Sequence, residues 1–438
     1  MALFTKEEAL AYHEQPRRGK VEVIPTKPCN SQKDLSLAYS PGVAEACLEI
    51  KNNPETAALY TGRNNLVGVV TDGSAVLGLG NIGPLAGKPV MEGKGVLFKT
   101  FADIDVFDIN LDVSSPEQLI EVTKTMEPTF GGINLEDIKA PECFMIEETL
   151  KKEMNIPVFH DDQHGTAVIS GAGILNACEI TGRNIEELKV VVVGAGAAGI
   201  ACSNFYVELG VKRENIFMFD SRGLIHQGRE GLNKYKAQFA QDKDYGDLAE
   251  CLKGAHCFLG LSVKNLLSKE MVQSMAPNPI IFAMANPDPE ISYDDAKAAV
   301  PDCIMGTGRS DFPNQINNVS GFPYIFRGAL DVGATEINEA MKVAAAKALA
   351  ALAKEPVSEE VCAMYGVDSL SFGVDYIIPK PLDPRILEWE VPAVAQAAMD
   401  TGVATAPIND MDAYRKSLRE RVNASHARVE AFVESYNK

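Results

Sequence analysis

The sequence predicts an α/β protein with a doubly wound parallel sheet, a mixed α/β region before it and helices after it. Two short runs rich in β-branched and aromatic residues, Leu188–Val193 and Ile216–Asp220, are typical of strands buried on both faces. Between them lie a glycine-rich turn and an apolar segment up to Gly210 that is predicted as a helix. Two later apolar segments, Cys257–Leu261 and Pro279–Ala285, alternate with polar helical segments, as in a parallel sheet with crossover helices.

The composition is that of an ordinary globular protein. Hydrophobic residues make up 46% and charged residues 23% of the 438 residues, which argues against a disordered chain, a collagen or a coiled coil. The formal net charge is −19, from 41 Lys and Arg against 60 Asp and Glu. A field this acidic repels phosphate backbones, so we expect no nucleic-acid partner. At about 150 residues per domain, the length predicts two or three domains.

Nothing in the sequence predicts export or insertion into a membrane. We expect no signal peptide, because Met1–Lys20 lacks an apolar segment followed by a cleavage site. The most apolar stretches are short or interrupted by Gly, Pro or Lys, so we expect no membrane partner. Nine scattered cysteines without a Cys-x-x-Cys pair fit reduced thiols. We therefore predict a cytoplasmic protein.

The chain is predicted to divide into three parts, with edges near residues 165 and 325. Residues 1–165 form a mixed α/β domain, residues 166–325 the doubly wound domain and residues 326–438 a C-terminal helical segment. The expected strands of the first part are Leu66–Thr71, Val96–Thr100 and Val106–Leu111, and the expected helices of the last part are Val332–Ala353 and a charged final helix near Asp412–Lys438.

The glycine-rich turn predicts a Rossmann-type dinucleotide site. The pattern G-x-G-x-x-G is matched in full by Gly194, Ala195, Gly196, Ala197, Ala198 and Gly199. The turn follows a predicted strand and opens a predicted helix, and an acidic residue, Asp220, ends the next strand. Gly194 allows the tight turn, Gly196 lets a pyrophosphate approach the backbone, and Gly199 lets helix and strand pack closely. The helix N-terminus offers free N–H groups to the phosphates. A purely structural glycine turn is the alternative.

The preferred nucleotide is left open by the residues around Asp220. An acidic residue at this position binds the ribose hydroxyls of NAD. Ser221 and Arg222 follow at once, however, and Arg222 is able to pair with the 2′-phosphate of NADP. Lys234 and Lys236 are further candidates for that contact.

A second match to the same pattern, Gly78–Gly83, lies far upstream of the first. Pro84 and Gly87 follow it, which makes the required helix doubtful. We therefore interpret this segment as a structural or substrate-side turn.

Two pairs of adjacent carboxylates predict a site for a hard divalent cation. Glu136 and Asp137 lie in GINLEDIKAPECF, and Asp161 and Asp162 lie in FHDDQHGT. Oxygen-only ligands suit Mg²⁺ or Mn²⁺. A solvated acidic face is the alternative, but each pair stands beside turn residues and between apolar runs rather than inside a charged stripe.

His160 and His164 flank the second acidic pair and raise the alternative of a zinc site. A tetrahedral zinc site needs cysteines or further histidines in register, and none is close in the sequence. We expect both histidines to be hydrogen-bonded groups that support the site or the fold.

A lysine and a tyrosine are candidates for proton transfer, although neither is distinctive alone. Lys94 stands between two glycines, just before a predicted strand, so neighbours in sequence give its side chain little cover. Tyr39 precedes the turn Ser40-Pro41-Gly42. A solvated lysine and a packed aromatic side chain are the alternatives. Lysine serves as a base for a hydroxyl only if burial or a nearby cation lowers its pKa from about 10.4.

Several long segments, found here in the same order, resemble the malic enzymes, and most closely the short bacterial type. The segments are SLAYSPGVA (Ser36–Ala44), VVTDGSAVLGLGNIGPLAGKPVMEGKGVLFK (Val69–Lys99), GGINLEDIKAPECF (Gly131–Phe144), PVFHDDQHGTA (Pro157–Ala167), VVVVGAGAAGIA (Val190–Ala201), ANPDPE (Ala285–Glu290), SDFPNQINNVSGFPYIFRGALD (Ser310–Asp331) and YIIPKPLDPR (Tyr376–Arg385). The resemblance implies oxidative decarboxylation of L-malate to pyruvate and CO₂, with NAD or NADP as oxidant and Mn²⁺ or Mg²⁺ as the metal.

The same motifs imply a role for each candidate residue. Lys94 would be the general base for the C2 hydroxyl, Asp161 would pair with it, and Tyr39 would protonate C3 of the enolpyruvate intermediate. The implied metal ligands are Glu136, Asp137 and Asp162. The remaining implied contacts are Thr166 and Asn286 with the nucleotide, and Ser74, Asn286 and Asn318 with the substrate.

Departures from other members of that family change what we expect of substrate binding and regulation. Larger animal-type malic enzymes carry an arginine that binds a malate carboxylate, where this chain has Ala75. We expect Ser74, asparagines or backbone amides to replace it. Some bacterial relatives carry a long C-terminal acyltransferase-like domain, which we expect this chain to lack. Because family members are oligomeric, we expect a homodimer or a higher homo-oligomer.

Two other functions are alternatives. A 2-hydroxy-acid dehydrogenase that stops at oxaloacetate would need neither a decarboxylation metal nor an acid such as Tyr39. A non-enzymatic sensor that binds dinucleotide and malate would have lost Tyr39, Lys94 or Asp162, and all three are present.

Overall fold

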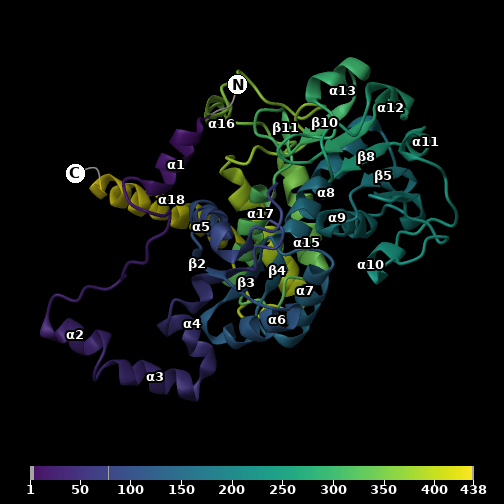
Figure 1. Ribbon diagram of the computed structural model, residues 1–438. Helices are drawn as coiled ribbons and strands as arrows, with labels where there is room; N and C mark the ends of the chain where they lie inside the picture. The colour runs from purple at the N-terminus through teal and green to yellow at the C-terminus, as the bar shows by residue number, and fades with distance from the viewer. Residues whose placement is uncertain (1–3, 77, 437–438) are drawn as a thin grey trace.

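The computed structural model describes residues 4–76 and 78–436 and contains two sheets (Figure 1). The first sheet has the strand order β2-β1-β3-β4, and all its pairs are parallel. Its strands are β1 (Leu66–Thr71), β2 (Asp105–Asn110), β3 (Gly132–Leu135) and β4 (Val158–His160). Leu135 is the register partner of His160, so the residues that follow β3 and β4 lie side by side at the carboxyl edge.

The second sheet is doubly wound and confirms the predicted fold class. Its order is β11-β10-β9-β8-β5-β6-β7, parallel except for the antiparallel pair of β6 and β7. The strands are β5 (Val190–Val193), β6 (Ile216–Asp220), β7 (Gly223–Leu224), β8 (Cys257–Gly260), β9 (Ile280–Ala283), β10 (Ile304–Thr307) and β11 (Asn314–Gln315). The strand order reverses at β5, because β6 lies on one side of it and β8 on the other. Ligands of such sheets bind in the crevice at this reversal.

Helices flank both sheets and form most of the C-terminal part. In chain order they are α1 (Lys6–Glu14), α2 (Gln32–Ala38), α3 (Val43–Asn52), α4 (Ala57–Tyr60), α5 (Gly83–Ala102), α6 (Pro116–Thr125), α7 (Glu142–Glu153), α8 (Asp161–Thr181), α9 (Ala197–Glu208), α10 (Lys234–Ala237), α11 (Leu248–Leu252), α12 (Lys269–Ser274), α13 (Tyr293–Ala299), α14 (Phe322–Asp331), α15 (Glu339–Leu352), α16 (Glu359–Met364), α17 (Arg385–Asp400) and α18 (Met411–Tyr436). The predicted final helix is α18, which contacts α5 and α17; Asn437 and Lys438 lie outside the described residues. Within the described chain, no helix combines the length and apolar character needed to cross a bilayer.

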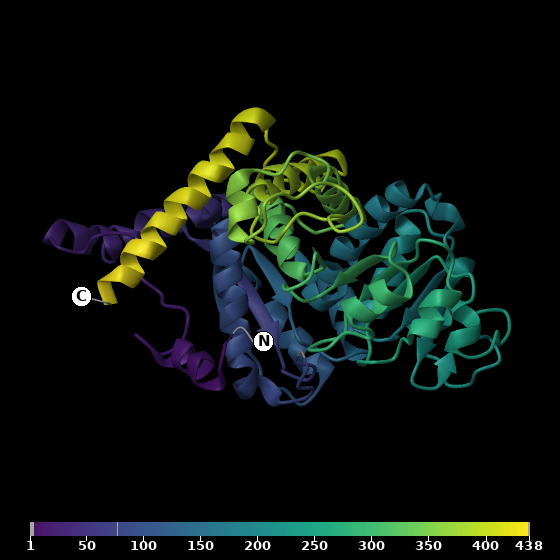
Figure 2. The same cartoon turned by 90° about the horizontal axis from the view of Figure 1, so that it is seen from above.

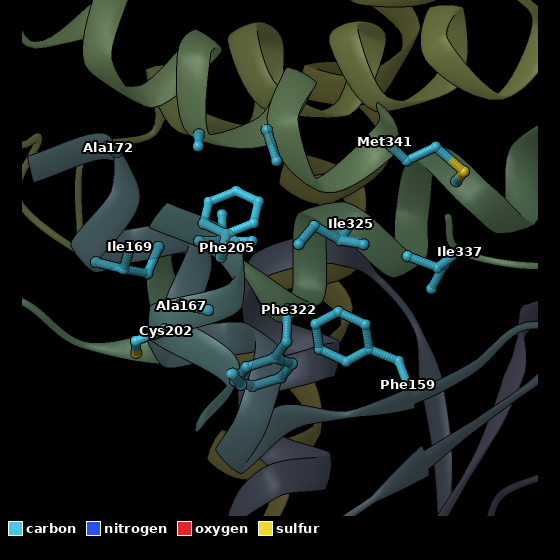
Figure 3. Close-up of a cluster of buried hydrophobic side chains, with 14 of the residues drawn as sticks. Phe159, Ala167, Ile169, Ala172, Cys202, Phe205, Phe322, Ile325, Ile337 and Met341 are labelled. Carbon is cyan, nitrogen blue, oxygen red and sulfur yellow. The ribbon is translucent and has the colours of Figure 1, made fainter. Parts of the chain in front are cut away.

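The two sheet regions meet at a packed junction of α8, α9, α14 and α15 (Figure 3). Ile169 of α8, Phe205 of α9, Phe322 of α14 and Met341 of α15 are buried there. Gly171 lets α8 and α9 approach closely, because a Cβ atom at this position would lie 2.5 Å from the ring of Phe205. Since α8 begins directly after β4, this junction fixes the residues at the start of α8.

Two elements differ from the sequence prediction. The predicted strand Val96–Thr100 lies in α5, whose buried positions recur every three or four residues, the spacing of a helix face. The predicted helix Val332–Ala353 begins only at Glu339. Before it comes a turn in which Gly333 adopts a φ of +56°, and the side chain of Asn338 caps the helix.

The second glycine-rich match, Gly78–Gly83, is followed by a helix after all. Pro84 occupies the first turn of α5, where a proline is tolerated because its missing N–H needs no partner there. The turn folds back on the segment after β1, where the backbone N–H groups of Ile82 and Gly83 donate to the carbonyl of Gly73. These contacts are those of a structural turn.

Helices α2 and α3, residues 32–52, form an arm that stands away from both sheets (Figures 1 and 2). Neither helix has a buried residue. The large hydrophobic residues exposed on the arm are Leu35, Leu37, Tyr39, Val43 and Leu48. The arm therefore presents an apolar surface that the rest of the described chain does not cover.

Candidate active site

Lys94 lies in a buried charged cluster rather than on the surface. It belongs to α5 and is 7% exposed. Its Nζ is 2.6 Å from Asp161 Oδ2 and 2.9 Å from Glu136 Oε1. The same atom lies 4.2 Å from the ring centre of Phe322. The strand predicted to follow Lys94 is wrong, because residues 96–100 continue the same helix, and Lys94 lies on the buried face of that helix.

The two predicted acidic pairs meet at the carboxyl edge of the first sheet. Glu136 and Asp137 follow β3, and Asp161 and Asp162 open α8 directly after the neighbouring strand β4. One oxygen from each of Glu136, Asp137 and Asp162 lies within 4.8 Å of the others. The backbone N–H of Asp137 donates to Asp162 Oδ2 at 2.8 Å, which links the two segments. Asp137 has a φ of +53°, a left-handed conformation that aspartate tolerates better than most residues.

Electrostatics at this edge favour a bound cation. Burial raises the pKa of Asp162, and the charges of Asp137 and Asp161 raise it further. Burial likewise raises the pKa of Glu136 despite the opposing effect of Lys94. Burial opposes the charge of Lys94, but Asp161 and Glu136 outweigh it and hold the pKa of Lys94 above its usual value. Buried carboxylates that one lysine does not fully neutralise form a donor set that fits Mg²⁺ or Mn²⁺.

Small and amide residues hold the charged groups in place. A Cβ atom at Gly165 would lie 2.1 Å from Asp161 Oδ1, so only glycine leaves room for this carboxylate. The side-chain amide of Asn318 donates to Asp161 Oδ2. Asn134 donates to Glu136 Oε2 at 2.8 Å and is fully buried. Asn134 was not predicted from the sequence, which also did not predict the strand β3; two residues apart along an extended chain, Asn134 and Glu136 point to the same side.

The two histidines stand beside the acidic cluster and not in it. His164 Nε2 lies 2.8 Å from Glu147 Oε1, and its Nδ1 lies 3.0 Å from Lys342 Nζ. Burial lowers the pKa of His164 to about 4, so its ring is neutral near pH 7. His160 is fully buried. Among the described residues, the gathered metal-ligand set contains carboxylates alone, which favours a hard cation over zinc.

Tyr39 is a predicted catalytic residue that has no described contact with this charged cluster. It ends α2 on the arm and is 74% exposed. No described contact joins it to Lys94, whose ion-pair partners are Asp161 and Glu136. Within a single chain, the acid and the base implied by the resemblance are therefore not brought together.

The predicted substrate contacts lie near the cluster but already have partners. The hydroxyl of Ser74 donates to Asp72 Oδ1 at 2.6 Å and accepts from the backbone N–H of Lys139. The backbone N–H of Ala75 donates to the carbonyl of Asp137 at 2.9 Å, so the position without the arginine adjoins the acidic cluster. Asn318 contacts Asp161, as described above. Whether Ser74 and Asn318 contact a substrate stays a prediction.

The glycine turn has the geometry that a pyrophosphate needs. Gly194 adopts a φ of +116°, and a Cβ atom there would lie 2.4 Å from the carbonyl oxygen of Leu261. A Cβ atom at Gly199 would lie 1.7 Å from the carbonyl oxygen of Gly194, which explains the close packing of helix and strand. Gly196 caps α9 and has open space on its Cβ side. These residues fit a dinucleotide whose phosphates approach the start of α9.

Other predicted nucleotide contacts lie around this crevice. Asp220 ends β6, and its carboxylate contacts Arg229 and Lys236. Thr166 lies in the second turn of α8, and Asn286 follows β9. The side chain of Asn286 donates to the carbonyl of Met284 at 3.3 Å.

Glu290 is a buried acid that the sequence analysis did not single out. Its carboxylate accepts from the backbone N–H groups of Ser262 and Ala285, at 3.0 and 3.1 Å. It therefore ties together the segments that follow β8 and β9. A Cβ atom at Gly260 would lie 2.4 Å from the carboxyl carbon of Glu290, so glycine is needed at the end of β8.

Known proteins resemble this chain over most of its length. Two family models match: "Malic enzyme, N-terminal domain" over residues 18–118 and "Malic enzyme, NAD binding domain" over residues 163–370. The NADP-dependent malic enzyme of Halomonas elongata is 57% identical over 402 residues, which cover 92% of this chain and 95% of that relative. The NADP-dependent malic enzyme of Salmonella typhimurium is 59% identical over 420 residues, 95% of this chain.

The chain spans only 55% of the length of that Salmonella relative, and the same share of two others. Among solved structures, the malic enzyme of Pyrococcus horikoshii has a TM-score of 0.90 and 40% identity, with 98% of both chains covered. The NAD-dependent malic enzyme of Thermotoga maritima has a TM-score of 0.80 and 42% identity, with 90% of this chain and 99% of that chain covered. The resemblance found in the sequence is thereby confirmed, and the chain belongs to the malic enzyme family.

Proposed function

We propose that the protein catalyses the metal-dependent oxidative decarboxylation of L-malate to pyruvate and CO₂, with reduction of NAD or NADP. The observation that carries this proposal is the buried contact of Lys94 with Asp161 and Glu136, next to the carboxylates of Asp137 and Asp162. A base and a hard-cation site so close together suit a substrate with a hydroxyl beside a carboxylate. Relatives named as malic enzymes at 56–59% identity support the reaction.

Each of the chain's residues then has a chemical task. Glu136, Asp137 and Asp162 would hold the divalent cation. The cation would supply positive charge to the substrate's C2 oxygen, and the nicotinamide would accept the hydride. Lys94 takes the proton of the C2 hydroxyl, and Asp161 keeps its Nζ in position. For this step Lys94 must first lose its own proton, and Asp161 and Glu136 are acceptors within 3 Å. Despite burial, these carboxylates hold the pKa of Lys94 above its usual value, and a divalent cation held beside it would lower that pKa.

We propose that Tyr39 reaches the site of a second copy of the chain, in a homodimer. Tyr39 would protonate carbon after decarboxylation, and it needs to lie near Lys94 to do so. In its own chain it stands on the exposed arm. The arm's exposed residues, among them Leu35, Leu37 and Leu48, form an apolar surface of the kind that partners cover. Exchange of an identical element between protomers is a common route to dimers.

We keep the domain edges near residues 165 and 325, which leave one sheet in each of the first two parts. We also propose a cytoplasmic location. It is supported by the nine cysteines, all described and none in a disulfide, as expected in a reducing compartment.

The test is a spectrophotometric assay of nicotinamide reduction with L-malate and Mn²⁺, in which pyruvate and oxaloacetate are measured in the same samples. We expect reduction that a chelator abolishes, with one pyruvate for each nucleotide reduced. Accumulation of oxaloacetate without pyruvate would support the non-decarboxylating dehydrogenase instead. No reduction with either nucleotide, while nucleotide binding persists, would contradict an enzymatic role on malate and favour a binding function.

A further inference from the structure

We propose that Phe322 is a positioning residue for Lys94, because its ring holds the amine in the direction that proton removal needs. This role depends on the proposed function, which makes Lys94 the base. Ion pairs with Asp161 and Glu136 bound the amine on two sides. The ring of Phe322 bounds it on a third side, and it does so without offering the amine a charged partner.

The ring of Phe322 lies against two side chains of α5, Lys94 and Phe98. Lys94 Nζ lies over the ring, 4.2 Å from its centre, a distance that leaves no room for water between them. The rings of Phe98 and Phe322 pack edge to face, with their centres 4.8 Å apart. Residues four apart share one face of a helix, so α5 presents its amine and its aromatic ring to Phe322 together. The position of the ring is therefore fixed from the same helix that carries the base.

The segment that begins α14 contacts both members of the Lys94–Asp161 ion pair. Phe322, the first residue of α14, is fully buried and lies against Lys94. Four residues earlier, the side-chain amide of Asn318 donates to Asp161 Oδ2, the oxygen that also accepts from Lys94 Nζ. Neither contact comes from the strands or helices of the first sheet region. The orientation of Lys94 thus depends on a segment that follows the second sheet.

The chemistry of an aromatic face gives this contact a direction. Such a face carries partial negative charge, so it attracts N–H groups and repels a lone pair. An amine that accepts a proton from substrate must present its lone pair, and Phe322 directs that lone pair away from itself. The open side is that of Glu136, which lies with the other proposed metal ligands. A substrate hydroxyl bound beside the cation would lie there. An aliphatic side chain would fill the same space without this preference.

Phe326 provides a matched control for Phe322. It lies one turn later on α14 and is also fully buried. Its ring packs edge to face against those of Phe98 and Phe159, with centres 5.3 and 5.7 Å apart. Within the described chain, Phe322 is the one aromatic residue whose ring lies under Lys94 Nζ. Replacing either ring removes core packing, but only the replacement of Phe322 removes a contact with the amine.

The first measurement is the steady-state kinetics of malate oxidation by the whole protein and by Phe322→Leu and Phe326→Leu. We expect kcat of Phe322→Leu to fall at least about tenfold, because a small displacement of a reacting group has an effect of this size. The KM values for malate and nucleotide should stay near those of the unmodified protein, since no proposed binding contact is removed. Phe326→Leu should keep kcat, although both variants should lower the melting temperature. Phe322→Met, with a flexible side chain that fills core space well, replaces Phe322→Leu if that variant does not fold.

The second measurement needs neither malate, metal nor turnover. The metal-free protein is treated with a water-soluble acetylating ester, and mass spectrometry measures the acetylated fraction of Lys94. This fraction should be small in the unmodified protein, where Lys94 is 7% exposed. It should rise in Phe322→Leu, whose amine has lost one of its three boundaries, and stay small in Phe326→Leu.

The matched pair of variants decides the outcome. Equal kcat in Phe322→Leu and Phe326→Leu would overturn the role of Phe322, and so would equal acetylation of Lys94 in the two. A rise in KM for malate with kcat unchanged would overturn it as well, because the ring would then serve binding rather than the position of the base. Absence of malate oxidation by the unmodified protein would instead contradict the proposed function, and acetylation would still show whether Phe322 holds the amine.

Discussion

Lys94 and Tyr39 are implied as the base and the acid of one reaction, yet the fold buries Lys94 and leaves Tyr39 exposed. Lys94 is 7% exposed, and two carboxylates and an aromatic ring surround its amine. Tyr39 is 74% exposed on an arm without buried residues. Under the proposed roles, one chain builds the part of the site that would bind metal and abstract a proton, and the group that would protonate carbon comes from another chain or from a movement of the arm.

The largest effect is expected from Lys94→Ala, which removes the base from the part that is built in one chain. Loss of a general base costs about a thousandfold in rate, so malate oxidation should become barely detectable. Nucleotide affinity, measured by calorimetry, should be retained, because the glycine turn belongs to the other sheet. Lys88→Ala is the control, since Lys88 is on the same helix and pairs with Asp108 at the surface. Loss of nucleotide affinity in the Lys94→Ala protein would mean that its role has been misassigned.

The next test asks whether Tyr39 acts within its own chain or across a dimer. Tyr39→Phe removes the acid, and we expect turnover to fall by about a hundredfold. A dimer is then prepared from one Tyr39→Phe subunit and one Lys94→Ala subunit, carrying different affinity tags and purified over both. If the arm is exchanged, one of its two sites combines an intact Lys94 with an intact Tyr39. That dimer should have about half the activity of the unmodified dimer.

If Tyr39 acts within its own chain, each site of the mixed dimer lacks one of the two groups. Activity would then stay at or below that of the Tyr39→Phe protein. A mass measurement that finds only monomer at micromolar concentration would contradict the exchange directly. Either result would mean that Tyr39 reaches Lys94 of its own chain by a movement of the arm during catalysis. The two regions would then differ in mobility, and no exchange of arms in a dimer would be needed.

The sequence predicts regular helices and strands better than it predicts which residues surround a charged side chain. β1 and β6 match their predicted ranges, Leu66–Thr71 and Ile216–Asp220, because uninterrupted apolar runs between turn residues leave few other interpretations. α5 was missed in part, since Gly93 and Gly95 suggested a turn. Gly95 is tolerated in this helix because it packs against Val106 of β2, at 3.4 Å from an added Cβ atom. Such a contact between distant segments has no local signal.

The same limit applies to the two ligand sites. The proposed metal ligands Glu136, Asp137 and Asp162 belong to the two acidic pairs that the sequence pattern indicates, and the adjacency of two strands brings them together; the choice of these three was implied by the resemblance. The partners of Asp220 were not found in full. Arg229 and Lys236 reach it from an irregular segment and a one-turn helix, whose paths no periodicity determines. The sequence also did not predict that the arm stands away from the sheets, because the pattern of apolar residues does not show whether their own chain or another chain covers them.

The smallest expected effect concerns Asn134 and tests whether the first region is fully assembled within one chain. Asn134 donates to Glu136 Oε2 and is fully buried, so Asn134→Ala should leave the carboxylate less well oriented. Loss of a group that orients a metal ligand lowers metal affinity by about tenfold or more. Titration with Mn²⁺ followed by electron paramagnetic resonance would measure this affinity.

Asn176→Ala is the control, because Asn176 is also buried and donates to the carbonyls of Ala350 and Ile377, away from the acidic cluster. Both variants should lower the melting temperature, but only Asn134→Ala should weaken Mn²⁺ binding. Equal Mn²⁺ affinity in the two variants would mean that Asn134 does not orient Glu136 for the metal, and that the contact of Glu136 Oε1 with Lys94 is sufficient.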